Sequence, residues 1–376
     1  MSIDFKQQAV PGVQGLSPYQ PGKPIDELAR EYNLDPNDIV KLASNESPIG
    51  ASKKALAAIE AQLKDMARYP DGNGFELKAA LCEKLSSSSN KIKAEQITLG
   101  NGSSDILEFI VKVFTRENDD VIVSQHAFSI YGAVAKMVGA NIIQVPAKNY
   151  GHDLEAMAQA ITDKTRIVFV TNPNNPTGTW NTKAELEAFL QAVPERVVVL
   201  LDEAYFEFVQ EDDYPCGIDY LDQYPNVVVT RTFSKAYGLA SLRVGYGVSH
   251  PDIADLMNRV RPPFNVDTFA QAAAVATLND AEYVAESIRT NNDGYAYLTS
   301  EFEKLGLAYI PSVGNFISFE VDVDAGQLFT GLLAKGVIIR PIASYEMPKH
   351  LRVSIGTQQE NERFIEALAE VLKDLS

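Results

Sequence analysis

Lys235 is the residue of this sequence with the clearest potential for chemistry. It lies just past residues 227–229, a run of valines that predicts a buried strand. Loss of solvation at such a place lowers the pKa of a lysine and frees its amine to form a Schiff base. Because most lysines are solvated surface residues, the prediction depends on the groups that other strands bring to Lys235.

An acidic and a phenolic side chain follow a second apolar run. Asp202 comes directly after residues 197–201, and Tyr205 stands three positions later. A carboxylate at the end of an apolar strand is unfavourable unless a cation accompanies it. Asp202 therefore either caps the next segment or neutralises a buried, protonated ring nitrogen. Tyr205 could hydrogen-bond a phenolate oxygen from the same side of the turn.

Small and amide residues follow two further runs. Gly102, Ser103 and Ser104 precede a predicted helix over residues 106–114. The free N–H groups and positive dipole at a helix start suit a phosphate, although simple capping by the serines explains them equally well. Asn175 lies in a double-proline turn, which holds its amide in a fixed direction.

An aromatic residue and an arginine complete this set. Phe128 follows residues 121–123 and either covers a planar ligand or belongs to the core, the more common role of such residues. Arg243 stands eight positions after Lys235 and could neutralise a phosphate. An amine, a carboxylate, a phenol, an amide, a phosphate cradle and an aromatic lid together complement pyridoxal 5′-phosphate. That cofactor carries an aldehyde, a ring nitrogen, a 3′-oxygen, a phosphate and a flat ring.

The elements that must position these residues alternate between short apolar runs and amphipathic helices. Helices are predicted, for example, at residues 106–114 and 184–193. Such alternation favours an α/β fold with a mainly parallel sheet, whose ligands collect at the carboxyl ends of the strands. The candidate residues above all follow strands. The predicted strands are residues 97–99, 121–123, 142–145, 167–170, 197–201, 227–229 and 244–248.

The chain divides into three parts on its composition. Residues 1–45 form an arm rich in Gly and Pro, with a short helix at 25–32 and a short strand at 39–42. Residues 46–265 form the large domain. Residues 266–376 form a smaller α+β domain, with predicted strands at 316–321, 337–339 and 351–355 and a final helix that opens with a capping box, Thr357 and Glu360.

Composition excludes several classes of partner. The net charge of −17 over 376 residues argues against binding to nucleic acid or an anionic membrane, and it means that local arginines must capture any anionic substrate. Cys82 and Cys216 stand far apart, which fits a reducing, cytoplasmic compartment. The four histidines show no ligand spacing, so no metal site is expected. No signal segment or 18-residue apolar window is present.

Motifs along nearly the whole chain resemble those of known enzymes. The order NPNNPTG, DEAY and TFSKAYGLASLRVGYG is similar to that of the fold-type I aminotransferases, which depend on pyridoxal phosphate. Within that group, the segments SPYQPGKP, KLASNESP, RYPDG and RPIASYEMPKHLRVSIGTQQENERF resemble the histidinol-phosphate aminotransferase family. The resemblance implies a fold-type I architecture, with a large domain built on a seven-stranded sheet and a smaller domain that closes over the substrate.

The resemblance also implies a role for each candidate residue. Lys235 would hold the cofactor and move the substrate proton, while Asp202 would keep the ring nitrogen protonated. The 3′-oxygen would be bound by Tyr205 and Asn175, the ring covered by Phe128, and the phosphate held by Gly102, Ser103, Ser104, Thr232, Ser234 and Arg243. Tyr69 would reach the cofactor phosphate of the other subunit, which implies a homodimer. The substrate would be bound by Tyr19, Asn45, Arg340 and Arg352.

The activity implied is a ping-pong transamination between L-histidinol phosphate and 2-oxoglutarate, in histidine biosynthesis. In this comparison, Arg352 matches an arginine that clamps a substrate carboxylate, and Arg340 matches one that helps to bind the substrate phosphate. Three alternatives stay open. These are an aromatic amino-acid aminotransferase, a decarboxylase of a phosphorylated amino acid, and a cofactor-sensing transcription regulator. The last would need a DNA-binding segment, for which the forty or so irregular residues at the start offer little room.

Overall fold

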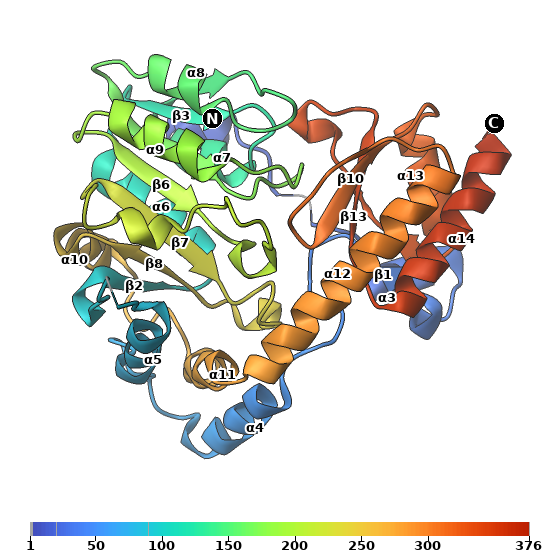
Figure 1. Ribbon diagram of the computed structural model, residues 1–376, viewed down its shortest axis with the longest axis horizontal. Helices are drawn as coiled ribbons and strands as arrows, with labels where there is room; N and C mark the ends of the chain where they lie inside the picture. The colour runs from blue at the N-terminus through green and yellow to red at the C-terminus, as the bar shows by residue number, and fades with distance from the viewer. Residues whose placement is uncertain (1–2, 20, 89, 376) are drawn as a thin grey trace.

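The computed structural model describes residues 3–19, 21–88 and 90–375. Residues 1, 2 and 20 of the expected arm, residue 89 of the expected large domain and residue 376 of the expected small domain lie outside it. Figure 1 shows a large body built on one sheet and a smaller body beside it. The long helix α12 (Ala281–Lys304) runs diagonally from one body into the other. None of the helices in the described part of the chain combines the length and apolar composition that a membrane span requires.

The large body contains the predicted seven-stranded sheet, which is mainly parallel. Its strand order is β2-β8-β7-β6-β5-β3-β4. Strand β8 runs antiparallel to both of its neighbours, and the remaining pairs are parallel. The strands are β2 (Ile97–Gly100), β3 (Asp120–Ser124), β4 (Asn141–Val145), β5 (Thr165–Thr171), β6 (Val198–Asp202), β7 (Val227–Thr232) and β8 (Gly245–Ser249).

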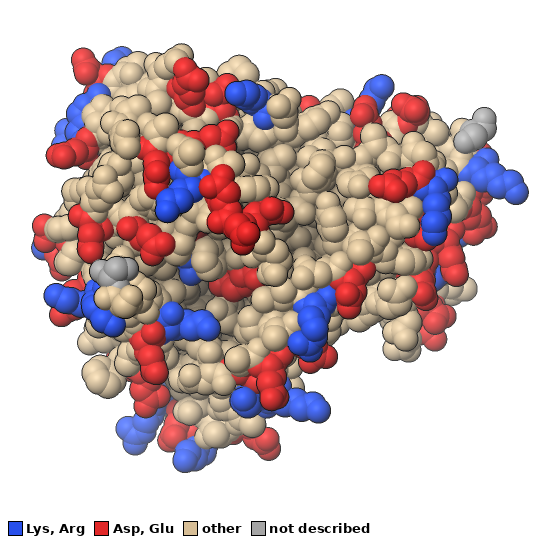
Figure 2. Space-filling model, in the orientation of Figure 1, with Lys and Arg blue, Asp and Glu red and all other residues tan. Residues whose placement is uncertain are grey.

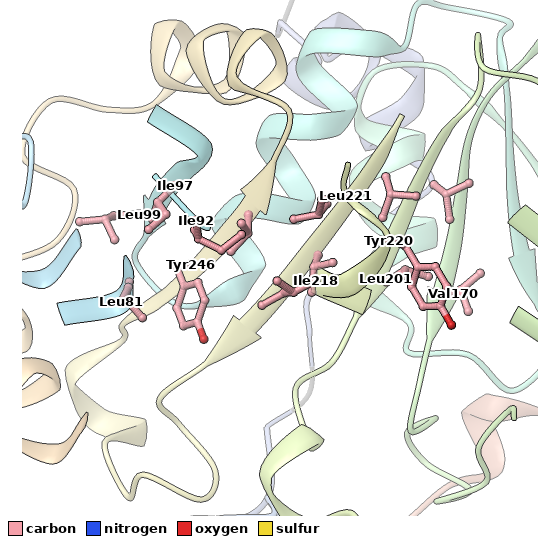
Figure 3. Packing of buried hydrophobic residues seen from close by; sticks show 14 of the residues in the cluster. Leu81, Ile92, Ile97, Leu99, Val170, Leu201, Ile218, Tyr220, Leu221 and Tyr246 are labelled. Atoms are coloured by element: carbon pink, nitrogen blue, oxygen red, sulfur yellow. The ribbon is translucent and has the colours of Figure 1, made fainter. Parts of the chain in front are cut away.

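Both faces of this sheet are buried, as the unbroken apolar runs in the sequence require. Along β6, Val199 and Leu201 belong to one hydrophobic cluster, and Val198 and Leu200 belong to the cluster on the opposite face. Figure 3 shows side chains of the first cluster, among them Leu201. The helices that cover the sheet include α6 (Ser103–Phe114), α7 (Ile130–Met137), α8 (Leu154–Gln159), α9 (Lys183–Ala192) and α10 (Pro251–Val260).

Three helices pack together at the β2 side of the sheet. Helices α4 (Lys53–Gln62) and α5 (Phe75–Leu85) pack against α11 (Thr268–Leu278). Alanines of α11, such as Ala270 and Ala274, are fully buried in the first cluster. Helix α11 therefore packs with the large body, although it follows the domain boundary expected after residue 265.

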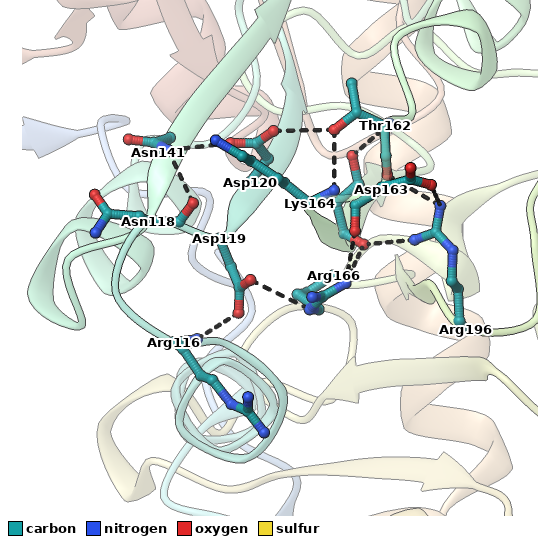
Figure 4. Close-up of polar contacts among 11 residues, drawn as sticks. Arg116, Asn118, Asp119, Asp120, Asn141, Thr162, Asp163, Lys164, Arg166 and Arg196 are labelled. Atoms are coloured by element: carbon teal, nitrogen blue, oxygen red, sulfur yellow. Dashed lines mark hydrogen bonds and ion pairs between the residues drawn. The ribbon is translucent and has the colours of Figure 1, made fainter.

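Polar contacts fix the amino ends of β3, β4 and β5 (Figure 4). Asp120 accepts hydrogen bonds from Nδ2 of Asn141, at 3.1 Å, and from Oγ1 of Thr162, at 3.2 Å. Its neighbour Asp119 forms an ion pair with Arg166 at 3.3 Å. These groups lie at the opposite ends of the strands from Thr171 and Asp202, so they fix the frame from which the candidate residues project.

The small body contains an antiparallel sheet of order β12-β13-β10-β9. Its strands are β9 (Tyr309–Ile310), β10 (Phe316–Glu320), β12 (Arg340–Pro341) and β13 (His350–Ser354), and its helices include α13 (Ala325–Ala334) and α14 (Gln358–Leu375). The predicted capping box of α14 is present, because the Glu360 carboxylate accepts from Thr357 N at 2.8 Å. Strands β9 and β12 were not predicted, since two residues give no periodic signal.

The N-terminal segment packs on the small body. The predicted helix at residues 25–32 is α3 (Ile25–Tyr32), and β1 (Val40–Lys41) pairs in parallel with β11 (Val337–Ile338). Leu28 of α3 lies in one cluster with Leu333 and Ile338. Two short helices that the sequence did not predict, α1 (Phe5–Gln8) and α2 (Pro11–Gln14), precede this segment.

Acidic and basic side chains are interspersed over the face shown in Figure 2. No broad basic area covers that face, in keeping with the net charge of −17. Attraction of an anionic ligand must therefore come from a local group of cations inside the molecule.

Candidate active site

A cavity at the carboxyl ends of the central strands brings together most of the residues expected from the sequence. It lies where the large sheet, the small sheet and residues 43–45 meet. The expected residues that line it are Tyr19, Asn45, Ser103, Ser104, Phe128, Asn175, Asp202, Tyr205, Thr232, Ser234, Lys235, Arg243, Arg340 and Arg352. Of these, Thr232 is the last residue of β7.

Lys235 presents its amine inside this cavity. Its Nζ donates a hydrogen bond to the backbone oxygen of Ser44 at 3.0 Å. Burial, and next the nearby charge of Arg352, lower the pKa of Lys235 to about 8. A substantial fraction of the amine is therefore neutral near physiological pH, as a nucleophile or a base requires.

Asp202 ends β6 and is almost fully buried. Its Oδ2 accepts a hydrogen bond from the hydroxyl of Tyr131 at 2.7 Å, and its Oδ1 accepts from the backbone N–H of Ala204 at 3.2 Å. Burial raises the pKa of Asp202 to about 6, and these two hydrogen bonds oppose that rise. A cation beside the carboxylate would favour its ionised form further.

Tyr205 lies close to Asp202 along the chain, with only 2% of its surface exposed. Its hydroxyl accepts a hydrogen bond from Nδ2 of Asn45 at 2.9 Å. The Asn45 amide is held in turn, because Oγ of Ser354 donates to its Oδ1 at 2.9 Å. Burial raises the pKa of Tyr205 to about 12, so the hydroxyl keeps its proton and can donate a hydrogen bond to an oxygen in the cavity.

Arg352 reaches from β13 of the small sheet to the large body. Its Nη1 donates to Oδ1 of Asn175, and its Nη2 donates to the backbone oxygen of Ala43 at 2.8 Å. The Nε of Arg352 has no partner among the described residues, although it is buried. Such an unpaired donor in a cavity wall is a place for an anionic ligand.

The side chain of Arg243 lies at the start of α6. The N-cap of α6 is Gly102, with φ of +86°, and a Cβ at this position would lie 2.4 Å from Nη2 of Arg243. Arg243 also donates from Nη1 to Oγ of Ser234 at 3.2 Å. The N-terminus of α6, the Ser234 hydroxyl and the Arg243 guanidinium thus lie together, a donor set suited to a phosphate. Gly102 does not line the cavity itself and instead allows Arg243 to approach the helix.

Arg340 stands directly opposite Arg352 in the register of β12 and β13. Its guanidinium lies 5.5 Å from the ring centre of Tyr19, and among the described residues it forms no ion pair. Two like charges on opposite strands repel unless an anion joins them. Among the described residues of the cavity wall, Asp202 alone carries a carboxylate, so the cavity is cationic in an acidic protein.

Three residues of the cavity wall were not assigned to the site from the sequence, although Tyr131, like Phe128, was consistent with either a ligand cover or the core. Tyr131, Thr171 and Tyr345 all line the cavity. Thr171 ends β5 just as Asp202 ends β6, so its place at the end of a predicted strand was a usable signal. Tyr345 comes from the small body, where Glu346 accepts hydrogen bonds from Gln125 and Gln144 of the large body, at 2.6 and 2.8 Å. No sequence spacing signals that approach.

Tyr69 lies outside this cavity. Its side chain is 82% exposed and stacks on Phe264, with ring centres 4.7 Å apart. It therefore makes no contact with the cavity of its own chain.

Comparison with known proteins identifies the family. Residues 37–368 match the family model described as aminotransferase class I and II. The chain belongs to this family. A histidinol-phosphate aminotransferase 2 of Pseudomonas fluorescens strain Pf-5 is 56% identical over 372 residues, which cover 99% of each chain. A histidinol-phosphate aminotransferase 2 of Pseudomonas aeruginosa is 55% identical, covering 98% of this chain and 99% of that protein.

Solved aminotransferase structures agree with this assignment. The crystal structure of histidinol-phosphate aminotransferase from Sinorhizobium meliloti, in complex with pyridoxal-5′-phosphate, is similar with a TM-score of 0.87 and 29% sequence identity, covering 98% of each chain. The expected fold-type I architecture and the resemblance drawn from the sequence motifs are therefore confirmed.

Proposed function

We propose that this aminotransferase uses pyridoxal 5′-phosphate to transfer the amino group of L-histidinol phosphate to 2-oxoglutarate, in histidine biosynthesis. The observation that carries the choice of substrates is the facing pair Arg340 and Arg352, which has no acidic partner in the described cavity wall. A phosphate dianion, or a keto acid with two carboxylates, joins two such cations. The names of the close relatives support the same choice.

The cavity fits the cofactor at each of its polar groups. The start of α6 with Arg243 suits the phosphate, and the buried carboxylate of Asp202 suits a protonated ring nitrogen. The amine of Lys235 is the partner for an aldehyde. When bound, pyridoxal phosphate supplies that aldehyde and a ring that withdraws electrons from the substrate Cα.

The protein's own residues then bind, orient and move protons. Lys235 Nζ, with its lowered pKa, would accept the proton from the substrate Cα and hold it for delivery to the former aldehyde carbon. The Tyr205 hydroxyl would donate a hydrogen bond to the 3′-oxygen of the cofactor, since the Asn45 amide already occupies a lone pair of that hydroxyl. Asn175 would donate from its Nδ2 to the same oxygen, because its Oδ1 accepts from Arg352. Phe128, in the cavity wall, would cover the ring.

The alternatives gain nothing from these observations. A phenylalanine or tyrosine donor brings a single carboxylate, which leaves one of the two facing arginines without an anion. A decarboxylase would need no keto acid. The relatives at 55–56% identity, which match this chain over almost their whole length, carry the names of aminotransferases. The same full-length match gives no support to a transcription regulator.

The proposal includes a homodimer in which Tyr69 serves the neighbouring subunit. Large apolar side chains are exposed along residues 56–75, the part of the chain that contains Tyr69, and these are Leu56, Leu63, Met66 and Phe75. Together with the exposed Phe264, which stacks on Tyr69, they support a second copy there. We also propose a cytoplasmic location, where the free cysteines Cys82 and Cys216 stay reduced. The proposal keeps an arm, a large domain and a small domain. The separate hydrophobic clusters of the two bodies support the two domains, and the arm shares a cluster with the small one.

Initial-rate kinetics test the reaction class. With L-histidinol phosphate varied at several fixed concentrations of 2-oxoglutarate, a transamination through one site gives parallel double-reciprocal lines. Intersecting lines, or release of carbon dioxide without any need for the keto acid, would contradict the proposal.

A further inference from the structure

Tyr131 contacts the buried carboxylate of Asp202 from an element that carries none of the expected cofactor ligands. It lies in the first turn of α7, and its side chain is 1% exposed. Its ring stacks on Phe169 of β5, with centres 4.6 Å apart and an angle of 14° between the planes. The ring is therefore fixed by packing, and its hydroxyl is fixed with it.

The hydroxyl of Tyr131 joins two neighbouring strand ends. Thr171 and Asp202 are register partners at the carboxyl ends of β5 and β6. Oγ1 of Thr171 lies 2.8 Å from the Tyr131 hydroxyl, which lies 2.7 Å from Oδ2 of Asp202. An ionised carboxylate only accepts, so the protons run in one direction, from Thr171 to Tyr131 and from Tyr131 to Asp202.

The Asp202 carboxylate has a second hydrogen-bond partner, and that partner is also a donor. The backbone N–H of Ala204 donates to Oδ1 of Asp202 at 3.2 Å. Burial alone would favour the protonated acid, and two donors aimed at the two oxygens favour the carboxylate. Burial and the nearby Asp202 raise the pKa of Tyr131 well above its ordinary value, so Tyr131 remains a donor throughout the neutral range.

Tyr131 also supports a second wall of the cavity. Phe128, expected to lie on the face of the cofactor, meets the Tyr131 ring edge to face, with centres 5.9 Å apart and planes at 87°. Tyr131 thus contacts both Phe128, expected on the face of the cofactor ring, and Asp202, expected at the ring nitrogen.

We propose that Tyr131, oriented by Thr171, is a positioning residue that keeps Asp202 ionised and aimed at the ring nitrogen of the cofactor. The inference rests on the proposed use of pyridoxal phosphate. It assigns to Tyr131 a role that acts through Asp202 and not through direct contact with the reacting atoms.

The variant Tyr131→Phe keeps the ring and its contacts with Phe169 and Phe128 and removes only the hydroxyl. Thr171→Val removes the donor behind Tyr131 and keeps a side chain of the same shape. Tyr224→Phe is a matched control, because that hydroxyl lies outside the cavity and, among the described residues, forms a hydrogen bond with Gln223 alone. Thermal melting of the three proteins shows whether each variant is folded.

The first measurement is the affinity of each protein for pyridoxal phosphate and for an analogue whose ring nitrogen is replaced by carbon. We expect Tyr131→Phe to weaken binding of the natural cofactor by about tenfold, as loss of a hydrogen bond to a charged group does. Binding of the carbon analogue should change by less than about twofold, a change of at most about 0.4 kcal/mol at 1.4 kcal/mol per factor of ten. Equal losses for both ligands would overturn the inference and make Tyr131 a packing residue.

The second measurement is the 15N NMR shift of ring-labelled pyridoxal phosphate bound to each protein. The wild type and Tyr224→Phe should give the shift of a protonated ring nitrogen. Tyr131→Phe should move the signal toward the unprotonated position, and Thr171→Val should move it less. An unchanged signal in Tyr131→Phe would overturn the inference. Failure of the wild type to bind the cofactor would instead contradict the proposed function.

If Tyr131→Phe does not fold, Thr171→Val decides the question, because it leaves every contact of the Tyr131 ring in place. A shifted ring-nitrogen signal in folded Thr171→Val supports the inference, and a wild-type signal overturns it.

Discussion

Arg352 on the small sheet donates a hydrogen bond to the side-chain oxygen of Asn175, which lies in the turn after β5 of the large sheet. The same guanidinium donates to the backbone of Ala43. One side chain therefore links both bodies and the N-terminal segment at the wall of the cavity. Its remaining N–H group, on Nε, is buried without a partner among the described residues.

Replacing Arg352 by lysine should lower kcat/KM for 2-oxoglutarate by about 100-fold, because an ammonium cannot present two parallel donors to a carboxylate. The affinity for pyridoxal phosphate should weaken by only a few-fold, through the freed amide of Asn175. Steady-state kinetics and cofactor titration measure the two effects. Arg30→Lys, an exposed arginine outside the cavity, is the control. A loss no larger than that of the control would contradict the role of Arg352.

Replacing Arg340 by glutamine should act on the phosphate substrate more than on other donors. We expect kcat/KM for L-histidinol phosphate to fall by about 100-fold, and that for L-phenylalanine by less than about tenfold. The reason is that Arg340 lies beside the Tyr19 ring and pairs in register with Arg352, so a substrate phosphate would engage both. Equal losses for both donors would show that Arg340 does not recognise the phosphate.

The lowered pKa of Lys235 predicts how the apoprotein recombines with pyridoxal phosphate. Only the neutral amine attacks the aldehyde, and a lowered pKa means that the amine loses its proton at a lower pH than a solvated lysine. The rate should rise with pH, reach half of its maximum near pH 8 and level off above it, where a lysine of pKa 10.5 would still be rising. Stopped-flow absorbance follows the reaction.

The variant Lys235→Ala is the control for that rate. It should show no covalent step at any pH and keep the circular dichroism spectrum of the wild type. A half-maximum near pH 10.5 in the wild type would mean that the cavity does not lower the pKa of Lys235.

Mixing two inactive variants tests whether Tyr69 serves the other subunit. In a heterodimer of Lys235→Ala and Tyr69→Ala, one site has a lysine from one chain and a tyrosine from the other, and both are intact. Unfolding and refolding an equal mixture should therefore restore activity well above the sum of the two variants. Mixtures that stay inactive, in a proven heterodimer, would place the function of Tyr69 within its own chain.

The sequence predicted the central sheet and the residues at its strand ends for a physical reason. Buried parallel strands are continuous apolar runs, and their carboxyl ends meet at one edge. Asp202 and Lys235 could therefore be assigned to one site without coordinates. Thr171 meets the same criterion, but threonine is so common at strand ends that its position alone does not predict a site residue.

Other parts of the site depend on tertiary packing that leaves no local pattern. Tyr131 belongs to the site because α7 lies over the ends of β5 and β6, and its ring was as consistent with the core. Tyr345 belongs to it because the small body approaches the large one through Glu346. For the same reason the place of α11 could not be predicted, as an alanine-rich helix packs equally well on either body.

The ratio of kcat/KM for L-histidinol phosphate to that for L-phenylalanine, both with 2-oxoglutarate, tests the central claim most directly. The facing arginines predict a preference for histidinol phosphate of about 100-fold or more, which corresponds to roughly 2.7 kcal/mol of transition-state binding. Comparable values, or a preference for phenylalanine, would contradict the proposed substrate and would identify a broad aromatic aminotransferase.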